Sequence, residues 1–157
     1  MYGQEHYAFR WVYASGGDIP ENAIVGGCED DGTPLFVARH SYGGSLVIGK
    51  AAPHLNGMNF GFGGDEHHTH EYEVLIGDIR MVRWVPYSGC LTHCEYTPLK
   101  AGHEPNGQEL FIAKARRGPG EVVGKVSTDM SNGMVYTYAG EERSIEYNET
   151  YYVLCIN

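Results

Sequence analysis

The sequence has few basic residues and no long apolar stretch. Its 157 residues contain 11 Lys and Arg against 20 Asp and Glu, which gives a formal net charge of −9. A nucleic-acid partner requires clustered Lys and Arg to neutralise phosphates, so this balance argues against one. No apolar run reaches the ~18 residues of a membrane-spanning helix. We therefore expect no insertion into a membrane.

The N-terminal residues lack the basic and apolar regions of a secretory signal. We therefore expect a chain that is cytoplasmic or secreted by a non-classical route. The four cysteines are expected to be reduced thiols; they are Cys28, Cys90, Cys94 and Cys155. The segment 90–94 has two Cys and one His, but no second ligand pair stands at zinc-site spacing. Its cysteines are interpreted as buried structural thiols, with a zinc site as the alternative.

Helical periodicity is also missing, whereas Gly and Tyr are abundant at 22 and 12 residues. Short apolar segments bounded by turn residues are typical of strands. The Asp31-Gly32 and Asn106-Gly107 dipeptides favour tight hairpin turns. We therefore predict an all-β fold of short antiparallel strands. The expected strands are 34–39, 46–48, 59–62 and 72–76, with counterparts at 109–114, 122–123, 135–138 and 151–156.

The chain contains an internal repeat. Residues 26–50 align without gaps on residues 101–125, at a constant offset of 75, and ten of the 25 positions are identical. Ordinary composition would give about two identities by chance. We predict two tandem repeats, residues 1–83 and 84–157, related by a pseudo-twofold axis and packed as one compact unit around a shared core.

Only two charged positions are retained identically in the gapless block, Glu29/Glu104 and Lys50/Lys125. One interpretation is a salt bridge between strands, which contributes about 0–1 kcal/mol when exposed. The other is a binding site at a strand end, present once in each repeat. A carboxylate accepts hydrogen bonds and an ammonium donates them, so such a pair suits the neighbouring hydroxyls of a sugar. Tyr and Trp side chains can add an apolar platform for the sugar's C–H face.

The segments PLFVAR, GGSLVIGK and NFGFGGDE resemble the DM-nine repeat, which also occurs in natterin-like proteins. The double copy covers nearly the whole chain and is similar to the small two-repeat members, which include mannose-specific lectins. The resemblance implies recognition of mannose or high-mannose glycans without a metal ion, a homodimer, and sugar contacts from Glu29 with Lys50 and from Glu104 with Lys125. The second copy departs from the pattern at residues 105–107 and 150–154.

A further pair of carboxylates, Glu66 and Glu142, is retained after a Gly turn. These residues either line the sugar site or hold the loop. The histidines beside Glu66 are not retained in the second copy; they are His67, His68 and His70. Closely spaced histidines and carboxylates bind Zn, Cu or Ni. The alternative function is therefore a metal-binding or self-assembling interaction protein that uses this loop.

Sequence motifs of hydrolases, phosphate-binding loops and dinucleotide-binding enzymes are missing. Duplicating one Glu and one Lys gives two similar sites rather than the acid and base of a glycosidase. We therefore expect a lectin and not an enzyme, with no cofactor and no physiological metal. Its expected role is pattern recognition in innate immunity through mannose-containing glycans.

Overall fold

The computed structural model describes residues 9–157, and nearly all of the regular structure in that range is strand. This confirms the predicted all-β class. The strands are β1 (Phe9–Ser15), β2 (Val25–Cys28), β3 (Pro34–Tyr42), β4 (Ser45–Ala52), β5 (Gly57–Phe62), β6 (Asp65–Thr69), β7 (Glu71–Gly77), β8 (Val82–Ser88), β9 (Thr97–Pro98), β10 (Lys100–His103), β11 (Glu109–Arg117), β12 (Gly120–Val126), β13 (Val135–Tyr138), β14 (Glu141–Ser144) and β15 (Thr150–Ile156). Two short 3-10 helices, η2 (Pro53–Leu55) and η3 (Ile79–Met81), interrupt them.

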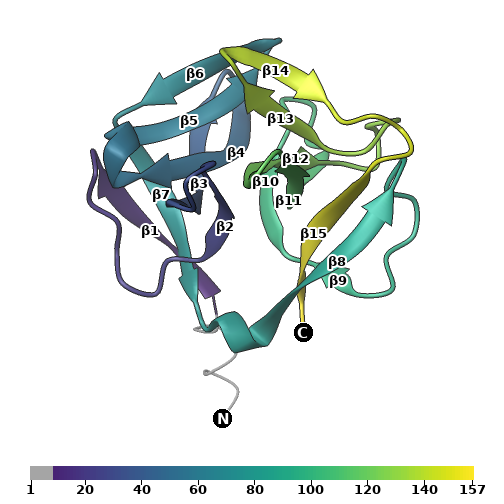
Figure 1. Cartoon of the computed structure of the whole chain (residues 1–157), viewed down its shortest axis with the longest axis horizontal. Coiled ribbons are helices and arrows are strands. Elements are labelled where there is room, and N and C mark those ends of the chain that lie inside the picture. The colour runs from purple at the N-terminus through teal and green to yellow at the C-terminus, as the bar shows by residue number, and fades with distance from the viewer. Residues whose placement is uncertain (1–8) are drawn as a thin grey trace.

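The two sequence repeats form two similar lobes, which Figure 1 shows on either side of the molecule. In the first lobe β3 pairs with β4 and β7, and β1 covers the other edge of β7. In the second lobe β11 pairs with β12 and β15, and β8 covers the other edge of β15. The same strand order in both lobes agrees with the predicted pseudo-twofold relation. The expected division between residues 83 and 84 falls within β8 and stays a prediction.

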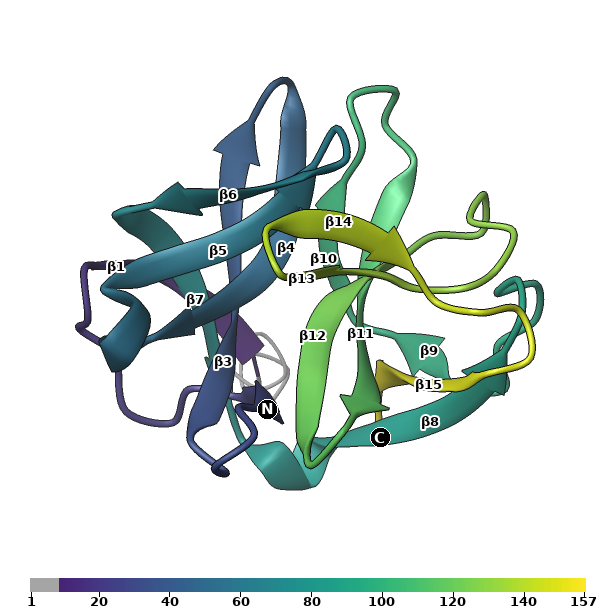
Figure 2. The same cartoon turned by 45° about the horizontal axis from the view of Figure 1, so that its top comes forward.

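Strands of each lobe also pair with strands of the other. Cys28 of β2 lies opposite Glu121 of β12, and His103 of β10 lies opposite Leu46 of β4. His103 lies 75 positions after Cys28, and Glu121 lies 75 positions after Leu46. The two junctions are therefore related by the repeat. A third junction joins the β5–β6 and β13–β14 hairpins, which lie side by side at the top of the molecule in Figure 1 and at its front in Figure 2. The strands therefore form one hydrogen-bonded network that runs through both repeats.

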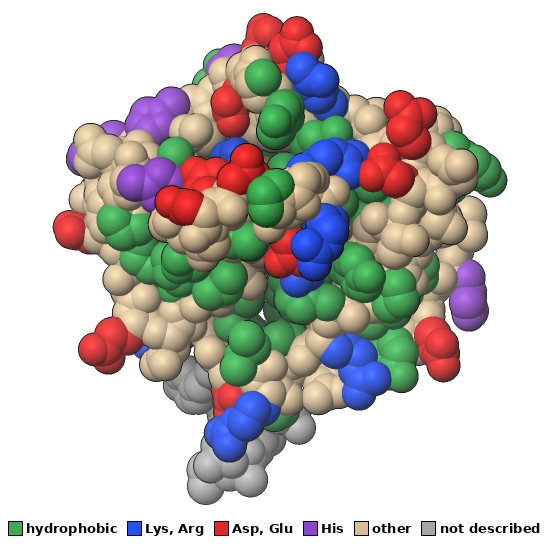
Figure 3. Space-filling model, in the orientation of Figure 1, with side chains coloured by type: hydrophobic (Ala, Val, Ile, Leu, Met, Phe, Trp, Pro, Cys, Tyr) green, Lys and Arg blue, Asp and Glu red, His purple; other side chains and the backbone are tan. Residues whose placement is uncertain are grey.

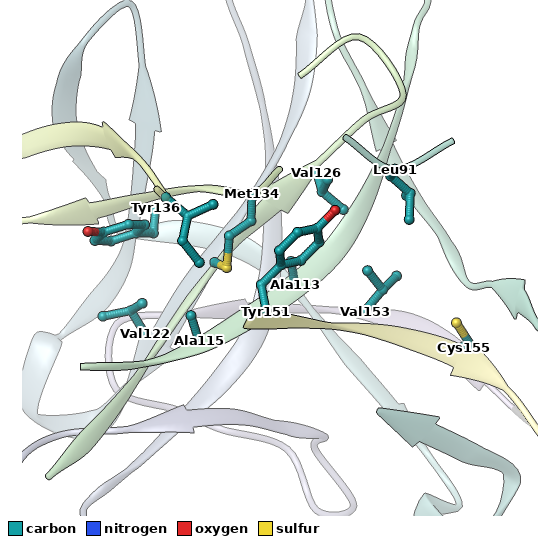
Figure 4. Packing of buried hydrophobic residues seen from close by; sticks show 11 residues of the cluster. Leu91, Ala113, Ala115, Val122, Val126, Met134, Tyr136, Tyr151, Val153 and Cys155 are labelled. Carbon is teal, nitrogen blue, oxygen red and sulfur yellow. The ribbon is translucent and has the colours of Figure 1, made fainter. Parts of the chain in front are cut away.

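The apolar core is continuous across the lobes. Figure 4 shows the core of the second lobe, where the buried ring of Tyr151 lies among aliphatic side chains. Its hydroxyl donates a 2.7 Å hydrogen bond to the Gly89 carbonyl oxygen. A further cluster contains Val37 and Ile112, equivalent residues of the two repeats that are both fully buried. Because each lobe supplies part of this shared core, the repeats stabilise each other.

Candidate functional site

The turn after β2 has a fixed backbone. The Asp31 carboxylate accepts a 2.9 Å hydrogen bond from the Thr33 N–H, and this bond holds the pKa of Asp31 below its usual range. Gly32 adopts a positive φ of 90°, which favours glycine, and its N–H donates to the Glu29 carbonyl oxygen. The local sequence therefore determines where the Glu29 side chain leaves the turn.

The Glu29 carboxylate meets a histidine and an aromatic ring. Its Oε2 atom lies 2.7 Å from His54 Nε2, and both side chains are about 40% exposed. An open cleft of about 590 Å³ surrounds this pair. Its wall includes Asp30, Asp31, Thr33 and Tyr138. Tyr138 belongs to β13 of the second repeat and is 52% exposed, with the Arg143 guanidinium 5.6 Å from the ring centroid.

The equivalent turn of the second repeat has the same backbone and different neighbours. Gly107 repeats the φ of 90° and donates to the Glu104 carbonyl oxygen, as Gly32 does to that of Glu29. The Gln108 amide donates a 2.8 Å hydrogen bond to Thr128 Oγ1. Sequence alignment after residue 125 places Asp129 at the position of His54. In the sequence, a carboxylate therefore stands at the position of the imidazole.

The two retained lysines pair with the other retained carboxylates. Lys50 Nζ lies 3.8 Å from Glu66 Oε2, and Lys125 Nζ lies 3.0 Å from Glu142 Oε2. Both lysines are largely buried, with 15% and 8% of the side chain exposed. Figure 3 shows acidic and basic side chains next to each other around the centre of the face that is turned toward the viewer. The structure thus brings each Lys to a hairpin carboxylate, whereas the contact made by Glu29 is with His54.

The Lys125 pair also joins the two repeats. Lys125 Nζ donates a 3.0 Å hydrogen bond to the Gly61 carbonyl oxygen of β5. Glu142 Oε1 accepts a 3.1 Å hydrogen bond from the Gly64 N–H. The other carboxylate oxygen is buried at ion-pair distance from the ammonium but without hydrogen-bond alignment. Electrostatic attraction to the ammonium therefore offsets part of the cost of its lost hydration.

The histidines of residues 67–70 have separate partners. His67 stacks on Phe60 at 5.4 Å and hydrogen-bonds to the Phe62 carbonyl oxygen. His68 Nδ1 lies 2.6 Å from Asn59 Oδ1. The imidazole of His70 lies near the backbone of Gly16. Within residues 9–157 no group of three or more His, Cys, Asp or Glu side chains has an arrangement that could hold a metal ion, and the four thiols are free.

Sequence reasoning missed His54 and Tyr138. Neither is retained between the copies, because Asp129 and Phe62 stand at the equivalent positions. The retention of Glu29, by contrast, did identify the strand end at which the cleft lies. Only the pairing of the repeats reveals that Tyr138 comes close to the turn of residues 29–33.

Comparisons with known proteins support a repeat fold. Residues 1–69 and residues 53–145 each match the family described as DM9 repeat. Curated proteins give no match. Among solved structures the chain is similar to the nematode sperm cell motility protein MFP2B, with a TM-score of 0.64 and 12% sequence identity. The likeness covers 94% of this chain and 44% of that one, and at this identity it shows the fold alone. Among the described residues there is no helix with the length and apolarity to cross a membrane.

Proposed function

The chain belongs to the DM9 repeat family, and we propose that it is a lectin that recognises mannose and high-mannose glycans. The resemblance to two-repeat mannose-specific lectins motivates the choice of sugar. The cleft beside Glu29 is the observation that carries the proposal. It combines hydrogen-bond acceptors, a donor and an exposed aromatic ring within a volume that suits a monosaccharide.

Each group in the cleft matches one part of a sugar. The Glu29 carboxylate accepts hydrogen bonds from hydroxyl groups, and the ring nitrogen of His54 that does not face Glu29 is left to bond a further hydroxyl. The exposed ring of Tyr138 offers an apolar face to the C–H groups of a pyranose. A neutral polyol satisfies such a mixed set without bringing a net charge to a chain whose formal charge is −9.

The retained lysines are assigned a supporting part in the same proposal. Glu29 and Glu104 act as acceptors, and Lys50 and Lys125 act as donors for sugar hydroxyls, as the family resemblance implies. Glu66 and Glu142 contact these ammonium groups at 3.8 and 3.0 Å. They therefore orient the lysines and hold the two hairpins.

Calorimetry with mannose, glucose and galactose tests the proposal. We expect wild-type protein to bind mannose with a preference over galactose, and the double variant Glu29→Ala/Glu104→Ala to lose binding. A matched control is Glu109→Ala, because that carboxylate is half exposed and pairs with Lys100 away from the cleft. Absence of mannose binding by wild-type protein would refute the lectin proposal. Unchanged binding by the double variant would refute the site.

Single-sugar affinity is expected to be weak, so useful avidity requires several sites in one particle. We propose that the chain forms a homodimer for this reason and serves pattern recognition on glycan-bearing surfaces. Analytical ultracentrifugation measures the oligomeric state. In the same samples we expect high-mannose glycans to be recovered uncleaved, because the proposed activity is binding without catalysis.

A further inference from the structure

The cleft beside Glu29 is built from both repeats. Glu29 lies in the turn after β2, and Tyr138 ends β13 of the other repeat. β12 of that repeat packs tightly on this turn. A Cβ atom added at Gly120 would lie 2.7 Å from the Cys28 carbonyl oxygen and 3.1 Å from Asp30 Oδ1. The position of Tyr138 relative to Glu29 is therefore set by the packing between repeats.

The hydrogen-bonding groups of the two turns are not equivalent. His54 Nε2 lies 2.7 Å from Glu29 Oε2 and donates to it, so the other carboxylate oxygen and the second ring nitrogen of His54 lie side by side for a ligand. Glu104 has the carboxylate of Asp129 at the aligned position, which supplies acceptors only when ionised. A sugar hydroxyl therefore meets an imidazole next to the carboxylate at the first turn, and a second carboxylate stands at the aligned position of the other.

The aromatic groups differ as well. Tyr138 is 52% exposed at the wall of the first cleft. The aligned residue, Phe62, is half-buried and packs edge-on against Tyr42 with centroids 5.2 Å apart. Its ring also lies against the backbone of Gly43. The first repeat's aromatic residue is therefore engaged in packing, whereas that of the second repeat is exposed to a ligand.

We infer that each chain has one strong sugar site, formed by Glu29 and His54 of the first repeat with Tyr138 of the second, and that the turn around Glu104 binds sugar at least tenfold more weakly. This inference rests on the proposed function and deepens it. It assigns ligand-contacting roles to His54 and Tyr138. With one strong site in each chain, avidity comes from the association of chains and not from two equal sites within one chain. The tenfold difference corresponds to the loss of about one hydrogen bond to a charged group.

Two glycines provide matched probes for the two turns. Gly32 and Gly107 have the same φ of 90° and the same hydrogen bond to the preceding Glu. We propose to titrate 15N-labelled protein with mannose and to follow the amide signals of both. The expected result is a saturable shift at Gly32 and a response at Gly107 with at least a tenfold larger Kd. Equal Kd values at the two glycines would overturn the inference.

Variants test the assigned residues. His54→Asp gives the first turn the residue of the second, and Tyr138→Ala removes the ring; each is expected to raise the Kd seen at Gly32 by about tenfold. Asp129→Ala is the control and should leave that Kd unchanged. Unchanged amide signals far from the cleft verify that each variant is folded. An unaltered Gly32 response in both first-cleft variants would reject their roles.

The same titration separates this inference from the lectin proposal. If mannose binds but shifts amides at neither turn, the lectin proposal stands and the single-cleft assignment fails. If mannose shifts no amide and gives no calorimetric heat, the lectin proposal itself fails.

Discussion

The ammonium group of Lys125 lies 3.0 Å from the carbonyl oxygen of Gly61, so a side chain of the second repeat is hydrogen-bonded to a strand of the first. The same nitrogen lies 3.0 Å from Glu142 Oε2. One lysine therefore joins its own hairpin to the hairpin of the other repeat.

Replacing Lys125 with Met is expected to destabilise the fold strongly. The change leaves the Glu142 carboxylate, which is only 15% exposed, without its cation. Breaking a buried pair costs about 3 kcal/mol. The Lys50→Met change should cost about 1 kcal/mol, because the Lys50–Glu66 distance is 3.8 Å and both groups are more exposed. Urea unfolding measures both values, and equal losses would contradict the proposed difference.

Gly102 is expected to tolerate no side chain. An added Cβ atom would lie 2.1 Å from the Leu46 carbonyl oxygen, at the junction of β10 with β4. The backbone at this junction cannot move away without separating the repeats. The Gly102→Ala substitution should therefore lower the free energy of unfolding by about 3 kcal/mol or more.

Gly63→Ala is the control for that change. Gly63 has a φ of 65° but no heavy atom within 4 Å of an added Cβ. Its substitution should therefore cost about 1 kcal/mol from backbone strain alone. Thermal unfolding compares the two variants, and a smaller loss for Gly102→Ala would show that the junction is more adaptable than its geometry indicates.

The protein should lose stability in alkaline solution. Burial raises the pKa of the fully buried Cys155 thiol from 9.0 to about 11, and burial raises that of Tyr151 from 10.0 to about 12. Between pH 9 and 11 the unfolded chain releases the Cys155 proton while the folded chain keeps it. The free energy of unfolding therefore decreases as pH rises, by about 2 kcal/mol for this thiol.

Urea unfolding between pH 8 and 10.5 under reducing conditions checks the alkaline effect. The Cys155→Ala variant should show a smaller decrease over this range, because only the tyrosine contribution remains. Most of that contribution comes above pH 10, the ordinary pKa of Tyr. A decrease of the same size in the variant would assign the effect to groups other than Cys155.

The repeat in the sequence predicted the strands well, and it did not predict how the copies meet. Self-alignment identified eight strands, and β13 has the bounds expected, residues 135–138. Alternation and turn residues are local properties, so they are visible in one copy. The pairing of Cys28 with Glu121 is not local, and the sequence of one copy carries no trace of it.

The same distinction applies to the candidate site. Retention in both copies selected Glu29 and Lys50, but the carboxylate lies against His54 and the ammonium against Glu66. Residues retained together need not touch, because retention records equivalent surroundings rather than contact. His54 and Tyr138 were missed because they distinguish the two copies, and a search for identity excludes such positions.

The histidines of β6 provide the last prediction, which concerns metal removal. His67 is fixed by stacking on Phe60, and His68 hydrogen-bonds to Asn59. Adjacent strand residues point to opposite faces of the sheet, so these two imidazoles cannot coordinate the same metal ion unless β6 is disrupted. We therefore expect mannose binding by the protein to be unchanged after treatment with a chelator and in the His68→Ala/His70→Ala variant.

Elemental analysis of protein purified without a metal column is the second measurement. Stoichiometric zinc, copper or nickel, together with loss of binding after chelation, would favour the metal-binding alternative, because a metal could then organise the hairpin that carries Glu66.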